Sequence, residues 1–197
     1  ELGYVDDDAT NQAWKLALPG KPTALAPLAD GTVITIVDRQ LLAARAGALA
    51  WQSLEDLRGW LVVTGDTILV ATTDRIVAVD PAAGHERWSV ALPPIAGADE
   101  YSDTPKAELV TLAADGLWIG DSEARFFRLR PDRCARNSPK KTATGCLTPA
   151  GALVDETLDS DARLTVDSAG RRALHEFGVV RMFDERWTTT LTARARD

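Results

Sequence analysis

The side chains best suited to covalent chemistry are two cysteines, Cys134 and Cys146, which flank the stretch CARNSPKKTATGC. They stand 12 positions apart. This spacing is too long for a two-cysteine redox motif, and no histidine lies nearby to complete a zinc site. A pair that flanks turn formers and lysines predicts a disulfide, which would stabilise the fold by about 2–3 kcal/mol. A disulfide would in turn indicate an oxidising compartment. The alternative is two free thiols in a cytosolic protein.

Acid–base or metal chemistry would fall to the histidines and the acidic runs. The only histidines, His85 and His175, each precede a glutamate. Neighbouring residues on a strand point to opposite faces, so the histidine and glutamate of each pair are not placed to act together as acid and base. Both pairs are expected on the solvated surface. The runs DDD (6–8) and DETLDSD (155–161) could offer carboxylates to calcium, but consecutive acids diverge. The sequence therefore predicts no catalytic residue, no metal site and no bound cofactor.

One segment concentrates positive charge in a chain of net charge −7. The stretch RFFRLRPDRCARNSPKK holds seven basic residues and one acid, and strand alternation puts Arg128 and Arg130 on one face. It predicts a docking patch for an acidic partner or for lipid headgroups, and the alternative is a solvated outer strand with its loop. The residues of this predicted patch are Arg125, Arg128, Arg130, Arg133, Arg136, Lys140 and Lys141.

The bulk composition limits the class of protein. A chain of 197 residues that is 45% hydrophobic fits one domain with a core. Its acidic balance argues against a nucleic-acid partner. No run of 18 apolar residues is present, so any membrane association is expected through an anchor outside this sequence. Arginine outnumbers lysine by 17 to 5, which is typical of a GC-rich bacterial gene.

The elements that must position these residues follow from a repeat. Trp14, Trp51 and Trp88 recur at intervals of 37 residues, and Gly47 and Gly84 each stand four positions before a tryptophan. Each repeat contains short β-branched and aliphatic runs that are separated by turn formers, which indicates four strands. This period is typical of a β-propeller blade, whose sheet buries its faces by stacking on its neighbours.

The sequence therefore predicts an all-β chain with almost no helix. An N-terminal tail at 1–13 is followed, within 14–197, by about four antiparallel four-stranded blades at 22–51, 59–92, 107–149 and 151–193. The tryptophans are expected to pack between blades, and the glycines to form the turns that deliver them. The expected repeat anchors are Trp14, Trp51, Trp88, Trp187, Gly47, Gly84 and Asp80. The longer spacing from Trp88 to Trp187 predicts insertions at the rim.

The stretch AVDPAAGHERW resembles the repeat of pyrroloquinoline-quinone-type propellers, with matches at Ala78, Asp80, Gly84 and Trp88. LAARAGALAW (42–51) carries a shortened form of the same repeat. This family includes quinone-dependent alcohol and sugar dehydrogenases, the outer-membrane assembly lipoprotein of the Bam complex, and extracellular sensor domains of bacterial Ser/Thr kinases.

The resemblance implies a non-catalytic scaffold or binding module of an exported bacterial protein, in the periplasm or at the outer membrane or cell surface. Propellers of this family usually have seven or eight blades. About four blades would then be part of a larger ring, form an open arc, or be completed by a second copy of the chain or by a protein partner. The alternatives are a fragment or relative of a quinone-dependent dehydrogenase and the ligand-sensing ectodomain of a receptor kinase.

Overall fold

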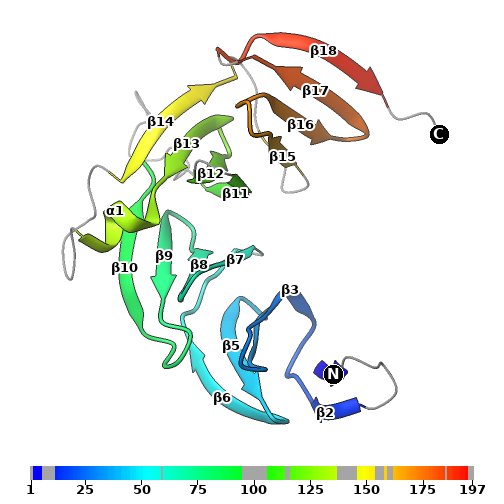
Figure 1. Cartoon of the computed structure of the whole chain (residues 1–197), viewed down its shortest axis with the longest axis vertical. Coiled ribbons are helices and arrows are strands. Elements are labelled where there is room, and N and C mark those ends of the chain that lie inside the picture. Colours follow the sequence, from blue (N-terminus) through cyan, green and yellow to red (C-terminus); the bar gives the residue numbers. More distant parts are fainter. Residues whose placement is uncertain are drawn as a thin grey trace. The chain divides into compact units, whose positions relative to one another are not determined.

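A computed structural model of the chain describes residues 2–5, 12–58, 60–94, 106–113, 116–136, 146–153, 158, 162–184 and 186–194. Within these residues, strands β1–β18 are joined mainly by turns, and α1 is the single helix (Figure 1). None of the described helical structure is long and apolar enough to cross a membrane.

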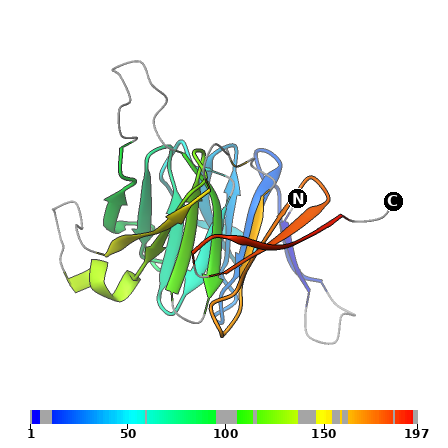
Figure 2. The same ribbon diagram turned by 90° about the horizontal axis from the view of Figure 1, so that it is seen from above.

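Four antiparallel four-stranded sheets make up most of the described chain, and each takes its strands in sequence order. Sheet 1 consists of β3 (Pro22–Pro27), β4 (Val33–Val37), β5 (Gln40–Arg45) and β6 (Ala48–Ser53). Sheet 2 consists of β7 (Leu61–Thr64), β8 (Thr67–Ala71), β9 (Arg75–Val79) and β10 (Glu86–Ala91). Sheet 3 consists of β11 (Ala107–Ala113), β12 (Gly116–Asp121), β13 (Arg125–Leu129) and β14 (Leu147–Ala152). Sheet 4 consists of β15 (Arg163–Val166), β16 (Arg172–Glu176), β17 (Val179–Phe183) and β18 (Thr189–Arg194). The strands of each sheet lie side by side in both ribbon views (Figures 1 and 2).

The expected N-terminal tail contains a β-hairpin. Strand β1 (Leu2–Val5) pairs antiparallel with β2 (Gln12–Leu16) and forms a two-stranded sheet. Trp14, Leu16 and Leu18 pack against Val33 and Ala44 of sheet 1. The apolar side chains of β2 and of Leu18, two positions beyond it, explain why this segment folds onto the array.

The expected fourth blade, 151–193, is shifted along the chain. Gly151 and Ala152 are the last residues of β14, so they belong to sheet 3, and sheet 4 begins only at Arg163. The insertion between β13 and β14 delays the outer strand of sheet 3, and that strand takes the first two residues expected in the next blade. Trp187 lies in the turn before β18, with a positive φ of 63°, and not within the strand.

The chain divides into two compact units, each with its own core. One comprises Glu1–Thr72 and Val77–Arg87, and the other comprises Thr73–Ile76 and Trp88–Asp197. In the first unit, buried Ile34 and Ile36 of sheet 1 pack with Val77 and Val79 of sheet 2. The buried core of the second unit is drawn from sheets 3 and 4 and their connections, and its large side chains are Trp118, Phe126, Leu164, Leu174, Phe183 and Trp187. Alternation along each strand thus supplies apolar faces that pairs of sheets bury together.

Candidate interaction surface

Trp51 connects the outer strand of sheet 1 to a turn of sheet 2. Its indole Nε1–H donates to the carbonyl oxygen of Pro81 at 2.9 Å. A Cβ atom added to Gly84 would lie only 2.6 Å from Cε3 of Trp51. Gly84 has a φ of +71°, so the β9–β10 turn needs glycine both for its backbone conformation and for the closeness of the ring.

Trp14 stands in a similar relation to sheet 1. A Cβ atom added to Gly47 would lie 3.4 Å from Cβ of Trp14. Both tryptophans precede their glycine by 33 positions. Trp14 of β2 therefore contacts the β5–β6 turn of sheet 1 in the way that Trp51 of β6 contacts the β9–β10 turn of sheet 2.

Trp187 is anchored differently. Its Nε1–H donates to the carbonyl of Ala150 at 2.7 Å, and its ring stacks on Phe126 with centroids 3.8 Å apart. A Cβ atom added to Gly151 would clash with the indole ring of Trp187. Trp187 thus contacts the strand of the preceding sheet, whereas Trp51 contacts a turn of the following one. Trp88 is buried on β10.

Asp80 shapes the turn that receives Trp51. Its Oδ1 accepts from the Ala82 amide at 2.8 Å, and its Oδ2 accepts from Arg87 Nη2 at 2.9 Å. Arg87 also reaches Asp66, at 2.9 Å. These hydrogen bonds from Arg87 are the largest cause of the lowered pKa of both carboxyl groups.

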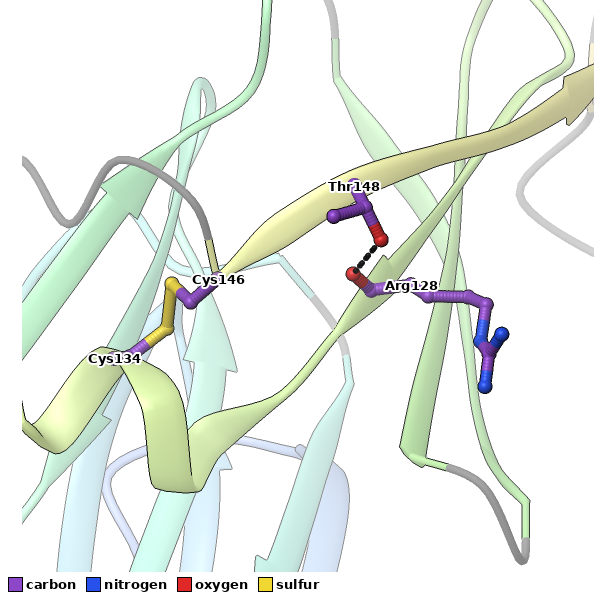
Figure 3. Close-up of a disulfide and its surroundings, with 4 residues drawn as sticks. All are labelled: Arg128, Cys134, Cys146 and Thr148. Atoms are coloured by element: carbon purple, nitrogen blue, oxygen red, sulfur yellow. Dashed lines mark hydrogen bonds between the residues drawn. A yellow bond between two sulfur atoms is a disulfide. The ribbon is translucent and has the colours of Figure 1, made fainter.

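The predicted disulfide is present between Cys134 and Cys146 (Figure 3). Both cysteines are buried, and their Cα atoms are 5.2 Å apart. Cys134 lies in helix α1 (Pro131–Arg136), and Cys146 immediately precedes β14. The bond therefore joins the two ends of an insertion between neighbouring strands of sheet 3.

The backbone hydrogen bonds show where this insertion enters the repeat. In sheet 2, Asp80 donates to His85, and Gly84 donates to Asp80. In sheet 3, Arg130 donates to Cys146, and Cys134 donates to Arg130. Cys134 therefore occupies the position of Gly84, and Cys146 occupies that of His85. The insertion opens between two residues that are adjacent in the regular turn.

Arg125, one residue of the predicted basic patch, has an internal role. Its Nε donates at 2.7 Å to Oδ2 of Asp121, whose side chain is fully buried. Its two Nη atoms donate to the carbonyls of Pro93 and Pro94, at 2.8 and 2.9 Å. Arg125 is therefore removed from the docking patch, since its donors already bind groups of this chain.

The other patch residues whose side chains the structure describes are Arg128, Arg130 and Arg133. Arg128 places its guanidinium 5.6 Å from the ring centroid of Trp118, and its side chain extends away from the disulfide in Figure 3. Its carbonyl accepts from the Thr148 hydroxyl at 3.4 Å. Arg130 is half-buried and Arg133 is exposed. The side chain of Arg136 and the whole of Lys140 and Lys141 lie outside the described residues, so their place in a docking surface stays a prediction.

The histidines and acidic runs form no described metal site. His85 and His175 are exposed, and His175 lies opposite Val180 in sheet 4. Across the described parts of the chain, no three His, Cys, Asp or Glu side chains converge. The DDD run and the acidic residues of DETLDSD fall outside those parts.

The sequence analysis missed the role of aspartate–arginine pairs. Asp121 binds Arg125, and Asp167 binds Arg171 at 2.6 Å, each across four positions. In both pairs the aspartate Oδ1 also accepts from the arginine backbone amide. The spacing Asp-x-x-x-Arg at a turn is the signal that could have identified Arg125 as a structural residue.

No protein-family profile matches the chain, and no curated protein sequence matches it. Solved structures do match. BamB from Moraxella catarrhalis is 15% identical with a TM-score of 0.59, over 98% of this chain and 70% of BamB. Streptogramin B lyase is 13% identical with a TM-score of 0.58, over 99% of this chain and 62% of the lyase. BBS1N in complex with ARL6DN is 12% identical with a TM-score of 0.57, over 87% of this chain and 56% of the matched chain.

These likenesses confirm the predicted fold class. The chain is an all-β, propeller-like array of four antiparallel four-stranded blades. It spans less than two thirds of streptogramin B lyase and of the BBS1N structure, and 70% of BamB.

Proposed function

We propose that the chain is a non-catalytic propeller module that binds other proteins and belongs to an exported bacterial protein of the periplasm, outer membrane or cell surface. The observation that carries this proposal is the Cys134–Cys146 disulfide at the β13–β14 turn. Such a bond persists in an oxidising compartment. It also restrains an insertion at the end of a sheet, and loops on a rigid scaffold are where binding residues gather.

The fold comparisons support the same proposal. BamB is a structure of this fold, and BBS1N is described in complex with a second protein, ARL6DN. The resemblance of AVDPAAGHERW to the pyrroloquinoline-quinone-type repeat agrees with this assignment. A second copy of the chain or a protein partner would complete the propeller and cover its exposed sheet faces and edges.

Site-specific photo-crosslinking in the producing cells tests the binding role. A photoreactive amino acid at Arg133, exposed on α1, is expected to trap a discrete protein partner. The matched control is His85, which is exposed in the corresponding turn of sheet 2, where there is no insertion. Absence of adducts at Arg133, or the same adducts at both positions, would overturn the proposal that the insertion binds a partner protein.

A separate assay tests the non-catalytic part of the proposal. Streptogramin B lyase has the same fold, so the fold by itself permits an enzyme. Purified protein is supplied with pyrroloquinoline quinone, calcium and a panel of alcohols, and dye reduction is followed. We expect no turnover above that of the denatured protein, and reproducible turnover would replace the binding module with a dehydrogenase.

A further inference from the structure

A cavity of about 460 Å³ opens where turns of sheets 1 and 2 meet, entirely within the first compact unit. The β3–β4, β7–β8 and β9–β10 turns all contribute to its lining. Apolar groups from Leu28, Trp51 and Val63 line it together with the charged side chains of Asp30 and Arg45. This volume lies within the range of about 300–1,000 Å³ that is usual for ligand sites.

The aromatic part of this cavity is preformed. Trp51 is held by its hydrogen bond to Pro81, and Gly84 lies against its ring. The indole therefore cannot turn without losing both contacts. Pro81 and Ala82 also line the cavity, so a rigid turn stands beside the ring. A rigid apolar surface binds a ligand side chain with little loss of conformational entropy.

The polar part of the cavity is an accessible pair of opposite charges. Arg45 Nη1 lies 3.3 Å from Asp30 Oδ2, and both side chains are more than half exposed, at 59% and 52%. Asp30 Oδ1 is already used, because it accepts from the Thr32 amide at 3.0 Å. This hydrogen bond is the largest cause of the lowered pKa of Asp30, so it favours the carboxylate form that accepts hydrogen bonds.

An exposed ion pair of this kind contributes little to stability, so it can rearrange around a ligand at small cost. Its carboxylate accepts a hydrogen bond, and its guanidinium donates several. A peptide unit offers one N–H donor and one C=O acceptor and therefore matches both groups. A free carboxylate or a free cation would be attracted by one member of the pair and repelled by the other, whereas an amide can hydrogen-bond with both.

We propose that this cavity binds an extended peptide segment of a partner protein, which places one large apolar side chain beside Trp51 and one backbone amide between Asp30 and Arg45. The inference rests on the proposed protein-binding function and assigns it a second, separate contact site. The aromatic ring of Trp51 in the lining suits such a segment, because aromatic-lined grooves bind extended peptides in other proteins.

Selection from a displayed library of random heptapeptides tests the inference. Peptides enriched on the wild-type chain are expected to share an aromatic residue or leucine at one position. Ala82→Trp fills the cavity from an exposed turn residue and should weaken binding of an enriched peptide by about tenfold or more. Ala83→Trp is the matched control, since Ala83 is the exposed neighbour outside the lining, and it should leave binding unchanged.

Two further results would overturn the peptide assignment. The first is failure of the library to enrich any shared residue, or equal binding to Ala82→Trp. The second is tighter binding of N-acetyl-leucine, with its free carboxylate, than of the enriched peptide with both ends blocked. Photo-crosslinking at Arg133 does not depend on this cavity. A partner trapped there, together with no peptide binding here, would remove this inference and leave the proposed function standing.

Discussion

The six-membered ring of Trp51 lies against Gly84, so closely that a Cβ atom at that glycine would be 2.6 Å from Cε3 and 2.8 Å from Cδ2. The two residues come from different sheets, and Trp51 also donates a hydrogen bond to the carbonyl of Pro81 in the turn that contains Gly84. Packing of sheet 1 on sheet 2 therefore requires that position 84 carry no side chain.

Replacing Gly84 by alanine is expected to destabilise the protein by about 2–4 kcal/mol, because the left-handed backbone and the clash with Trp51 both add cost. Gly65→Ala is the matched control. Gly65 also has a positive φ, of +57°, but its added Cβ would meet nothing within 4 Å, so only about 1 kcal/mol is expected. Urea unfolding measures both values, and equal losses would show that Trp51 does not constrain the turn.

Arg125→Gln should destabilise the protein by about 3 kcal/mol, because the buried carboxylate of Asp121 would lose its cationic partner. Arg133→Gln changes the same residue type at an exposed position and should cost less than about 0.5 kcal/mol. Adding Asp121→Asn to Arg125→Gln should recover part of the loss, since the uncompensated charge is removed. Thermal and urea unfolding of the four proteins check this. If Arg125→Gln were as stable as the wild type, Arg125 would return to the docking patch.

The double variant Cys134→Ser, Cys146→Ser should unfold with a free energy about 2–3 kcal/mol lower than the wild type, since the unfolded chain gains freedom. The reducing agent dithiothreitol should lower the melting temperature of the wild type but leave that of the double variant unchanged. Intact-mass measurement after alkylation without reductant checks the bond directly. Two alkylated thiols would contradict it and remove the main support for export.

Acidification should weaken the Arg87 network. Hydrogen bonds from Arg87 lower the pKa of Asp66 and Asp80 from 3.8, so the folded state favours the charged carboxylates more than the unfolded state does. Their contribution is present above the unfolded value and is lost as pH falls below about 4. The stability difference between wild type and Asp80→Asn should therefore shrink from pH 7 to about pH 3. A difference that stays constant in urea unfolding would show that the network does not couple to protonation.

The repeat made the fold predictable from the sequence. The equal spacing of Trp14 and Trp51 reflects one packing geometry, in which each ring lies against a glycine 33 positions later, and strand alternation supplies the rest. The predicted boundary between the third and fourth blades was wrong, because β14 includes residues that the sequence pattern assigns to the first strand of the fourth blade. The local sequence pattern could not reveal which sheet these residues join, because that depends on their pairing with β13.

The candidate site was predicted less well than the fold. The disulfide was predicted because the spacing and surroundings of the two cysteines exclude a redox motif and a zinc site. Arg125 was assigned to a charged patch, although its guanidinium binds the carbonyls of Pro93 and Pro94, which lie 32 and 31 positions earlier. The cavity beside Trp51 was missed because it is lined by turns that lie far apart in the sequence.

The position of the disulfide has a consequence for how this protein could vary. Cys134 and Cys146 occupy the places of two sequential neighbours in the regular turn, and their Cα atoms lie 5.2 Å apart. A covalent bond therefore closes the insertion at its two ends, whichever residues stand between the cysteines. We therefore expect that a loop of different length or charge can replace the residues between the cysteines while β13 and β14 keep their pairing.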